Sequence, residues 1–248
     1  MEEASVIYGK NVTLGQHVSL EPGVRIGDNV TIGNFVVVKS GTQIGDNVQI
    51  GDLCVLGKVP FHNKKVALKP STELNPLVIG DHVKIGSEVV IYRGVTLEYD
   101  VLVGDMASIR ERVSVGESSI IGRNVIVEPR TVIGRRVTIQ TSSYITSDML
   151  IEDQVFIGPC CSTSNDKYMG LGNYKHQGPV IKKHARIGNN ATLLPGVIIG
   201  EHAVVGAGAV ITKDVPEGQT FVGNPGRLLA RGGSSIEPEF RKYSSLET

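Results

Sequence analysis

Small or β-branched residues recur at every sixth position along most of this chain, and the residue two positions later is nearly always Ile, Leu or Val. Residues two apart on a strand face the same side of a sheet. The exceptions at the second position, Tyr8, Thr163 and Glu217, each sit at an end of a block of repeats. The pattern therefore predicts short strands whose first and third hexapeptide positions point into a shared core. The first block illustrates it, with Val6, Val12, Val18, Val24, Val30 and Val36 at the first position.

Glycine commonly follows the second inward residue, as in Ile26-Gly27, Ile44-Gly45 and Ile121-Gly122. We interpret these glycines as positive-φ corners that end each strand. A corner every six residues wraps a triangular prism with three hexapeptides per coil. The repeats amount to about ten coils, roughly 50 Å long at the usual strand spacing. One coil cannot bury its apolar face alone, so we expect an all-β parallel β-helix that is stable only as a stack.

Two excursions interrupt the repeat. Residues 58–76 break its phase, since the 23 residues from Cys54 to Leu77 are not a multiple of six. Residues 164–178 keep the phase, as if one coil were looped out. Loops on a rigid scaffold often carry function, and these contain His62 and His176. We expect one domain over 1–227 and a short tail over 228–248, with a weakly signalled helix near 237–244.

The composition narrows the class of protein. Twenty-five basic and 25 acidic residues leave no net charge, which argues against a nucleic-acid or membrane-surface partner. Aromatic residues make up 5% of the chain and Trp is absent, so the core must consist of small and β-branched residues. Three cysteines are too few for a disulfide framework. With no apolar run of 18 residues and no apolar leader, we expect a soluble cytoplasmic protein.

The last third of the chain resembles the hexapeptide-repeat, left-handed β-helix acetyltransferases. The likeness lies in Gly206-Ala207-Gly208-Ala209-Val210, Thr212-Lys213-Asp214-Val215-Pro216 and Gly223-Asn224-Pro225-Gly226-Arg227, where the family commonly has Ala in place of Gly226. The resemblance covers about residues 4–227. It implies a left-handed helix, a homotrimer and acetyl-CoA bound in the groove between neighbouring prisms. The residues it implies for the coenzyme are Ala207, Gly208, Ala209, Lys213, Gly223, Asn224, Pro225 and Arg227.

The physical case for those residues is close approach and charge. Small residues at Ala207, Gly208 and Ala209 would let a pantetheine arm approach backbone amides. Lys213 and Arg227 are suitable phosphate partners. The competing interpretation is that this segment is simply another corner of the β-helix, because glycine is common in all the coils.

The second excursion is similar to a more specific branch of the family. Ser164-Asn165-Asp166-Lys167-Tyr168 resembles the Asn-Asp-x-Tyr loop of enzymes that N-acetylate amino sugars on nucleotide carriers, although Met169-Gly170 stands where that branch often has Pro-Arg. The resemblance implies a nucleotide-linked amino sugar as acceptor. His176 is a candidate general base. Asp166 could orient the amine and accept its proton, and Asn165 could contact the sugar, or both could merely cap the loop.

Other polar residues are weaker candidates. His17, His82, His184 and His202 each precede an inward position, which predicts outward, solvated corners. His62 is a second, less favoured base. Lys64, Lys65 and Lys69 could hold a pyrophosphate but are better explained as a solvated charge run. Cys161 occupies an inward position, and nothing marks Cys160 as a nucleophile.

Three other functions stay open. A neutral amine attacks a thioester without a strong base, whereas a hydroxyl needs one, so O-acetylation would depend more on His176. A non-catalytic scaffold would have no need of the coenzyme segments. A γ-type carbonic anhydrase would need three histidines around a metal, and no histidine lies within five residues of another. We therefore expect no metal.

Overall fold

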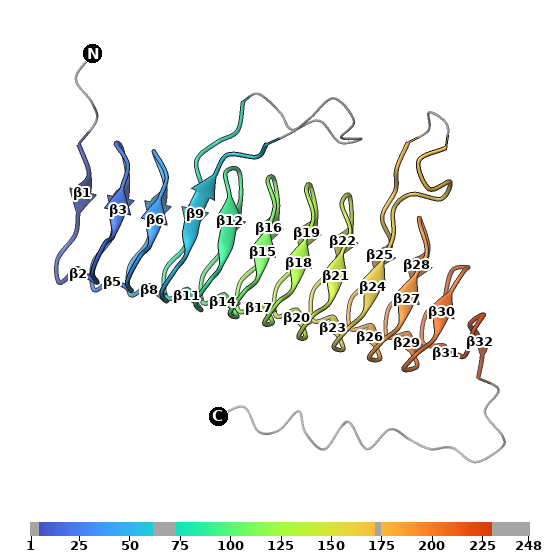
Figure 1. The fold of residues 1–248 in the computed structure, drawn as a ribbon. Helices are drawn as coiled ribbons and strands as arrows, with labels where there is room; N and C mark the ends of the chain where they lie inside the picture. Colours follow the sequence, from blue (N-terminus) through green and yellow to red (C-terminus); the bar gives the residue numbers. More distant parts are fainter. Residues whose placement is uncertain (1–4, 62–72, 172–174, 230–248) are drawn as a thin grey trace, which may run out of the picture.

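The computed structural model describes residues 5–61, 73–171 and 175–229. Three parallel sheets form the faces of a long β-helix (Figure 1), consistent with the left-handed winding that the resemblance implies. No helix in these ranges has the length and apolarity to cross a membrane. The interpretations of His62, Lys64, Lys65 and Lys69, and the helix near 237–244, fall outside the described residues.

We name the sheets A, B and C. Sheet A contains β1 (Ile7–Tyr8), β4 (Arg25–Ile26), β7 (Gln43–Ile44), β10 (Val78–Ile79), β13 (Thr96–Leu97), β16 (Ser114–Val115), β19 (Val132–Ile133), β22 (Leu150–Ile151), β25 (Val180–Ile181) and β28 (Ile198–Ile199). Sheet B contains β2 (Thr13–Leu14), β5 (Thr31–Ile32), β8 (Gln49–Ile50), β11 (Lys84–Ile85), β14 (Leu102–Val103), β17 (Ile120–Ile121), β20 (Thr138–Ile139), β23 (Phe156–Ile157), β26 (Arg186–Ile187), β29 (Val204–Val205), β31 (Thr220–Val222) and β32 (Arg227–Leu228). Sheet C contains β3 (Ser19–Leu20), β6 (Val37–Val38), β9 (Val55–Lys58), β12 (Val90–Tyr92), β15 (Ser108–Ile109), β18 (Ile126–Val127), β21 (Tyr144–Ile145), β24 (Ser162–Thr163), β27 (Thr192–Leu193) and β30 (Val210–Ile211).

Each coil takes one strand from each sheet, and β1 to β30 make up ten coils, as the repeats predict. An ordinary coil takes 18 residues, so that Ile120 pairs with Thr138 and Ile121 with Ile139. β31 begins an eleventh coil, and β32 folds back against it as an antiparallel partner. The chain turns at three edges of the prism, which we call the A–B, B–C and C–A corners.

The core confirms the expected inward positions. Both inward positions are buried along the stack, from Val24 and Ile26 to Ala209 and Ile211. The first coil is less buried, because no coil lies on its outer side. Hydroxyl groups at inward positions bond the backbone: the Ser143 side chain donates to the Gly158 carbonyl at 3.0 Å. Cys161 is also inward, and burial raises the pKa of its thiol.

The proposed role of the glycines was wrong. The positive-φ residue is the sixth of each hexapeptide, for example Asn29 (57°), Asn47 (58°) and Asn124 (55°), and not the preceding glycine. Gly122 is required for a different reason: a Cβ there would lie 2.7 Å from the Ile139 carbonyl oxygen of the next coil. Asn tolerates the left-handed conformation better than most residues with a side chain, so the corner needs no glycine for its φ angle.

Both excursions leave the helix at the C–A corner (Figure 1). The first separates β9 from β10, and Gln43 pairs with Val78 across 35 residues. The second separates β24 from β25, and Leu150 pairs with Val180 across 30 residues. Because β25 joins sheet A, the chain resumes at the very next face. The interpretation that a whole coil is looped out was therefore wrong.

The close approach of the coils makes a test. We expect Gly122→Ala to lower the melting temperature by several degrees, because the added methyl group meets backbone atoms that cannot move without opening the stack. The matched control is Asn124→Gly, which changes the same corner but adds no atoms and suits its positive φ. Thermal unfolding followed by circular dichroism measures both. An unchanged melting temperature for Gly122→Ala would show that the neighbouring coil does not require glycine there.

Candidate functional site

The C–A corner gathers polar side chains between the two excursions. Lys58, at the end of β9, lies over the Tyr92 ring at 5.4 Å. The Arg110 guanidinium lies over the same ring one coil further on, at 4.8 Å. Successive coils thus bring together residues that are far apart in sequence. We call this set the corner row; its members are Lys58, Tyr92, Arg110, Glu111, Glu128, Tyr144, Thr146, Ser147 and Asn165.

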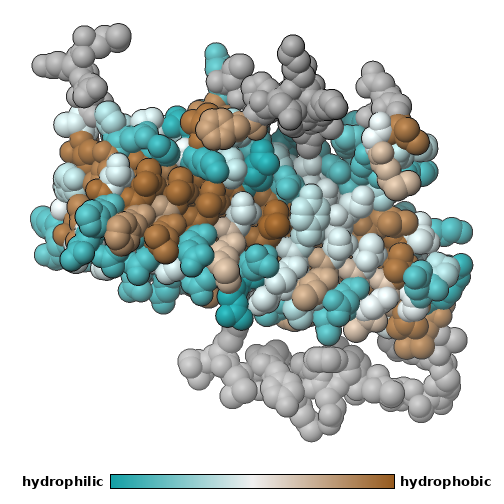
Figure 2. Space-filling model, viewed as in Figure 1, coloured by the Kyte–Doolittle hydropathy of each residue, from teal (hydrophilic) through white to brown (hydrophobic). Residues whose placement is uncertain are grey.

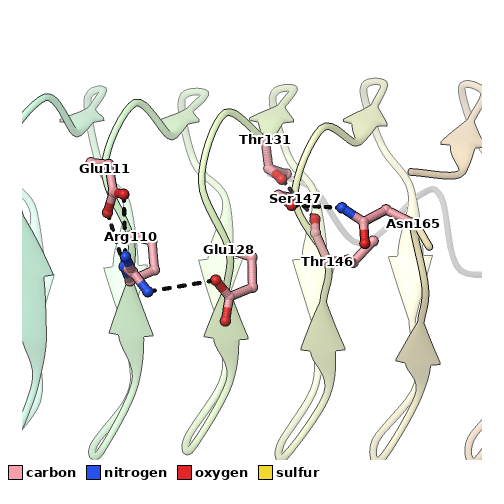
Figure 3. Close-up of polar contacts among 7 residues, drawn as sticks. All are labelled: Arg110, Glu111, Glu128, Thr131, Thr146, Ser147 and Asn165. Carbon is pink, nitrogen blue, oxygen red and sulfur yellow. Dashed lines mark hydrogen bonds and ion pairs between the residues drawn. The ribbon is translucent and has the colours of Figure 1, made fainter. Parts of the chain in front are cut away.

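Charge pairs form the first half of the corner row (Figure 3). The Arg110 side chain donates two hydrogen bonds to the Glu111 carboxylate, at 2.9 and 3.2 Å. Glu111 is 4% exposed, so this bidentate contact compensates a buried charge. Glu128, one coil away, lies 3.8 Å from the Arg110 guanidinium. One arginine therefore faces two carboxylates, and the charge of this cluster is negative when both are ionised.

Burial raises the pKa of the Glu128 carboxyl, and the nearby Arg110 charge opposes this rise. Glu128 also shares a side-chain hydrogen bond with Tyr144. Burial, followed by the charge of Glu128, raises the pKa of the Tyr144 hydroxyl. A carboxyl with a raised pKa beside a tyrosine is the kind of perturbed group that often marks a functional site.

The second half of the corner row connects to the second excursion. Thr146 and Ser147 are both 3% exposed. The Thr131 hydroxyl donates to the Thr146 carbonyl at 2.9 Å. The Asn165 amide donates to the Ser147 hydroxyl at 2.7 Å, as Figure 3 shows. Asn165 is therefore anchored to the coil beneath it, at the point where the excursion leaves the helix.

The excursion itself holds Asp166 and His176 close together. The Asp166 carboxylate accepts hydrogen bonds from the amides of Tyr168 (2.9 Å) and Gly170 (2.7 Å). Its Oδ2 lies 4.0 Å from His176 Nε2. The amide of Gln177 donates to the Asn165 carbonyl at 3.0 Å and closes the base of the loop. Asp166 thus caps its own loop, as the alternative interpretation holds, and also lies beside His176. The structure brings all three predicted catalytic residues into one loop.

Most of the predicted coenzyme residues gather at the B–C corner of the last coils. Ala207 and Gly208 are exposed there, and a Cβ on Gly208 would meet nothing within 4 Å. Gly223, Asn224 and Pro225 are exposed beside them, since Gly223 accepts a hydrogen bond from the Val210 amide and Gly226 donates to the Val210 carbonyl. The adjoining Arg227 is exposed on β32.

Two predicted coenzyme residues are placed differently. Ala209 is fully buried, so its side chain belongs to the core. Lys213 is exposed but follows β30 at the C–A corner, on the opposite edge of sheet C. The amides of Gly208 and Ala209 already donate to the carbonyls of Asn189 and Gly206. The segment therefore offers a close approach to a ligand, but not the N–H groups of these two residues.

Sequence reasoning missed Arg110, Glu111, Glu128 and Tyr144. The signal was available at the fourth hexapeptide position, where polar residues recur 18 residues apart as Arg110 and Glu128. We used the two inward positions alone, and these describe the core but not the corners. The four histidines predicted at outward corners do lie there, each with a positive φ.

The opposite pKa shifts of two similar carboxylates give a test. The side chains of Glu128 and Glu152 are equally exposed, at 24%, but the Lys182 hydrogen bond lowers the pKa of Glu152. Ionisation of Glu128 costs folding free energy as the pH rises through its raised pKa. We expect Glu128→Gln to gain melting temperature relative to the wild type between pH 4 and pH 8.

Glu152→Gln is the matched control with the opposite sign. Its stabilising ion pair is present above the unfolded pKa near 4.5 and is lost as the pH falls through the lowered value. This variant should melt below the wild type at pH 7, and the difference should shrink in acid. Parallel pH trends for the two variants would contradict the assigned environments.

Comparison with known proteins identifies the repeats. Residues 9–40 and 178–213 match the model described as bacterial transferase hexapeptide (six repeats), and residues 76–104 match the hexapeptide repeat of succinyl-transferase. A serine acetyltransferase of Bacillus subtilis is 32% identical over 111 residues, which is 38% of this chain and 51% of that protein.

Another relative is the dTDP-3-amino-3,6-dideoxy-alpha-D-galactopyranose 3-N-acetyltransferase of Aneurinibacillus thermoaerophilus. It is 43% identical over 49 residues, 20% of this chain and 26% of the relative. The acetyltransferase domain of PglB from Neisseria gonorrhoeae is a similar solved structure, with 27% identity, a TM-score of 0.40, and coverage of 54% of this chain and 57% of that one. The chain spans about half or less of each of these curated relatives. By its repeats, the chain belongs to the hexapeptide-repeat transferase family.

Proposed function

We propose that this protein transfers an acetyl group from acetyl-CoA to the amino group of a nucleotide-linked amino sugar. The observation that carries the proposal is the second excursion, which holds Asp166 4.0 Å from His176 and anchors Asn165 on Ser147. The partial likeness to an amino-sugar N-acetyltransferase supports the acceptor class, and relatives named as acetyltransferases support the donor.

The excursion supplies groups suited to amine acetylation. An amino sugar at neutral pH carries an ammonium group, which must lose a proton before it attacks the thioester carbonyl. His176 is the general base that takes this proton, and Asp166 positions the imidazole and stabilises its charged form. Since the Asp166 carboxylate already accepts two loop amides, it also holds the shape of the loop. Asn165 contacts the sugar.

The C-terminal coils supply the donor side. The exposed small residues Ala207 and Gly208 let the pantetheine arm lie against the backbone, beside Gly223, Asn224 and Pro225. Arg227 pairs with phosphate at this corner. Lys213 lies on the other edge of sheet C, so it serves a different part of the ligand or the acceptor side.

The acceptor extends along the corner row. The row leads from the second excursion over several coils towards the first, and it presents the Glu128 carboxyl, the Tyr144 hydroxyl and the Arg110 guanidinium. Such groups bond sugar hydroxyls and amines. Binding energy from these remote contacts would align the acceptor amine with the thioester.

The active assembly is proposed to be a homotrimer, with the ligands in grooves between neighbouring prisms. Apolar side chains are exposed on the coils: Phe35 and Leu53 at the B–C corner are 54% and 53% accessible. Figure 2 shows hydrophobic surface gathered over the N-terminal half of the face in view. A neighbouring copy would cover such surface.

An O-acetyltransferase is the second candidate, because serine acetyltransferases are among the relatives. The same Asp166–His176 pair would serve a hydroxyl acceptor, which depends on a base more strongly than an amine does. The two candidates therefore differ in acceptor and in the size of the effect when His176 is removed.

The acceptor class is tested by thiol release from acetyl-CoA with dTDP-linked amino sugars, their hydroxyl counterparts and L-serine. We expect turnover with an amino sugar, and a fall of about 10²-fold in kcat for His176→Gln. Asp166→Asn should shift the pH profile of kcat while it retains part of the activity, because an amide oxygen still accepts the loop N–H groups. His82→Asn, at a corner outside the loop, is the control.

Turnover confined to hydroxyl acceptors, with a loss near 10⁴-fold in His176→Gln, would replace the proposal by O-acetylation. If no acceptor is acetylated and acetyl-CoA does not bind in a calorimeter, the protein is a scaffold and the enzymatic proposal is wrong.

The donor side predicts a selective change. Arg227→Gln should raise KM for acetyl-CoA by about tenfold, the loss of one charge-assisted contact with phosphate. KM for the acceptor should stay the same, and Arg227→Lys should recover part of the loss. Arg25→Gln, exposed on the second coil, is a charge-matched control. Equal effects of the Arg227 and Arg25 changes would remove Arg227 from the donor site.

A further inference from the structure

Two histidines and a glutamate meet at the A–B corner of the ninth and tenth coils, away from both excursions. His184 lies between β25 and β26, and His202 lies one coil further, between β28 and β29. Glu201 directly precedes His202. One ligand atom from each of the three side chains lies within 4.8 Å of the other two. Within residues 5–61, 73–171 and 175–229, no other group of three His, Cys, Asp or Glu side chains lies as close together.

We propose that His184, Glu201 and His202 form a binding site for a divalent transition-metal ion, with Zn²⁺ as the best match. Imidazole nitrogen with one carboxylate oxygen suits zinc, nickel or copper, whereas magnesium and calcium favour oxygen ligands alone. Three protein ligands leave a position for water on a tetrahedral ion. The sequence predicts no metal because its histidines are far apart along the chain, but a coil brings residues 18 apart into contact.

The backbone holds the two histidines in place. Both occupy the positive-φ corner position, with φ angles of 60° and 55°. The His202 amide donates to the Lys183 carbonyl at 3.0 Å, and the His184 amide donates to the Asp153 carbonyl at 3.2 Å. The imidazole rings consequently stack in parallel, with centroids 4.6 Å apart and planes 3° apart. The two ligands are therefore organised before any ion arrives.

Small side-chain movements complete the site. His202 Nε2 lies 3.7 Å from Glu201 Oε1, close to the roughly 3.4 Å between ligands that bind one zinc ion at about 2.1 Å. The side chains of His202 and Glu201 are 61% and 46% exposed, so their χ angles can turn. His184 is the less exposed ligand and forms the fixed side of the site.

The surrounding charges permit a cation. Lys182 is the nearest neighbour along the chain with a printed partner, and its ammonium group is paired with Glu152 at 2.7 Å. Lys183 is exposed, which lets its side chain extend into solvent. Glu201 supplies the negative charge. An ion held here would join the ninth and tenth coils, just before the C-terminal segment that carries the proposed donor site.

The other corner histidines offer natural controls. His82 lies beside the Tyr99 ring and within 3.5 Å of the Asn47 amide, and His17 stacks on Phe35. These have the same backbone position but aromatic and amide neighbours. Asn is the best replacement at all four positions, because Asn already occupies this corner at Asn29 and Asn47 with positive φ.

Calorimetric titration of the chelator-treated full chain with ZnCl₂ tests the proposal. We expect one ion per chain and at least tenfold weaker binding in His184→Asn and in His202→Asn. His17→Asn and His82→Asn should bind as the wild type does. Cys160→Ser should also bind normally, which excludes capture by this exposed thiol. Zinc should raise the melting temperature of the wild type but not that of His202→Asn.

Two results would overturn the site: no zinc binding to the wild type, or binding that His184→Asn and His202→Asn leave unchanged. A loss of binding as large in His82→Asn as in His202→Asn would also do so, because it would point to diffuse surface capture. None of these measurements depends on acetyl transfer, so the metal site and the proposed enzymatic activity can fail separately.

Discussion

Backbone hydrogen bonds between successive coils are the constraint on which the rest of this structure depends. At the middle of the stack the Ile120 amide donates to the Val137 carbonyl and the Gly122 amide to the Ile139 carbonyl, both at 2.8 Å. Every backbone group of a short strand needs such a partner once it is buried. The 18-residue coil satisfies this requirement, and as a result each side chain lies directly against its equivalents in the coils before and after it.

This stacking decides which residues fit at the corners. Where two coils approach most closely there is no room for a Cβ, and glycine is required at positions such as Gly122. Where there is room, stacked side chains must suit one another. Asn11 and Asn29 bond through their amides, and His184 and His202 stack their rings. Like charges would repel at this distance, which is why the corner row alternates Arg110 with carboxylates and aromatic rings.

Different corners of one prism can thus carry separate chemistry. The C–A corner holds both excursions, the corner row and the pair Asp166 and His176, whereas the B–C corner of the last coils holds most of the proposed coenzyme segment. The A–B corner holds the proposed metal site. A rigid stack keeps these positions fixed relative to one another, and a mobile loop needs only to order a few side chains on top of it. Asn165 shows how this happens, since its amide is tied to Ser147 of the preceding coil.

The sequence by itself determined the fold class, the number of coils and the inward residues, because a buried face imposes a six-residue period that is visible in any single strand. It also located both excursions, as breaks in that period. Only the tertiary structure decided what meets at the corners. Residues such as Arg110 and Glu128, or His184 and His202, become neighbours through the height of one coil, and glycines that looked like turns proved to be points of close contact. Outward positions carry no hydrophobic signal, so their partners follow from the winding of the coils, and the winding exists only in three dimensions.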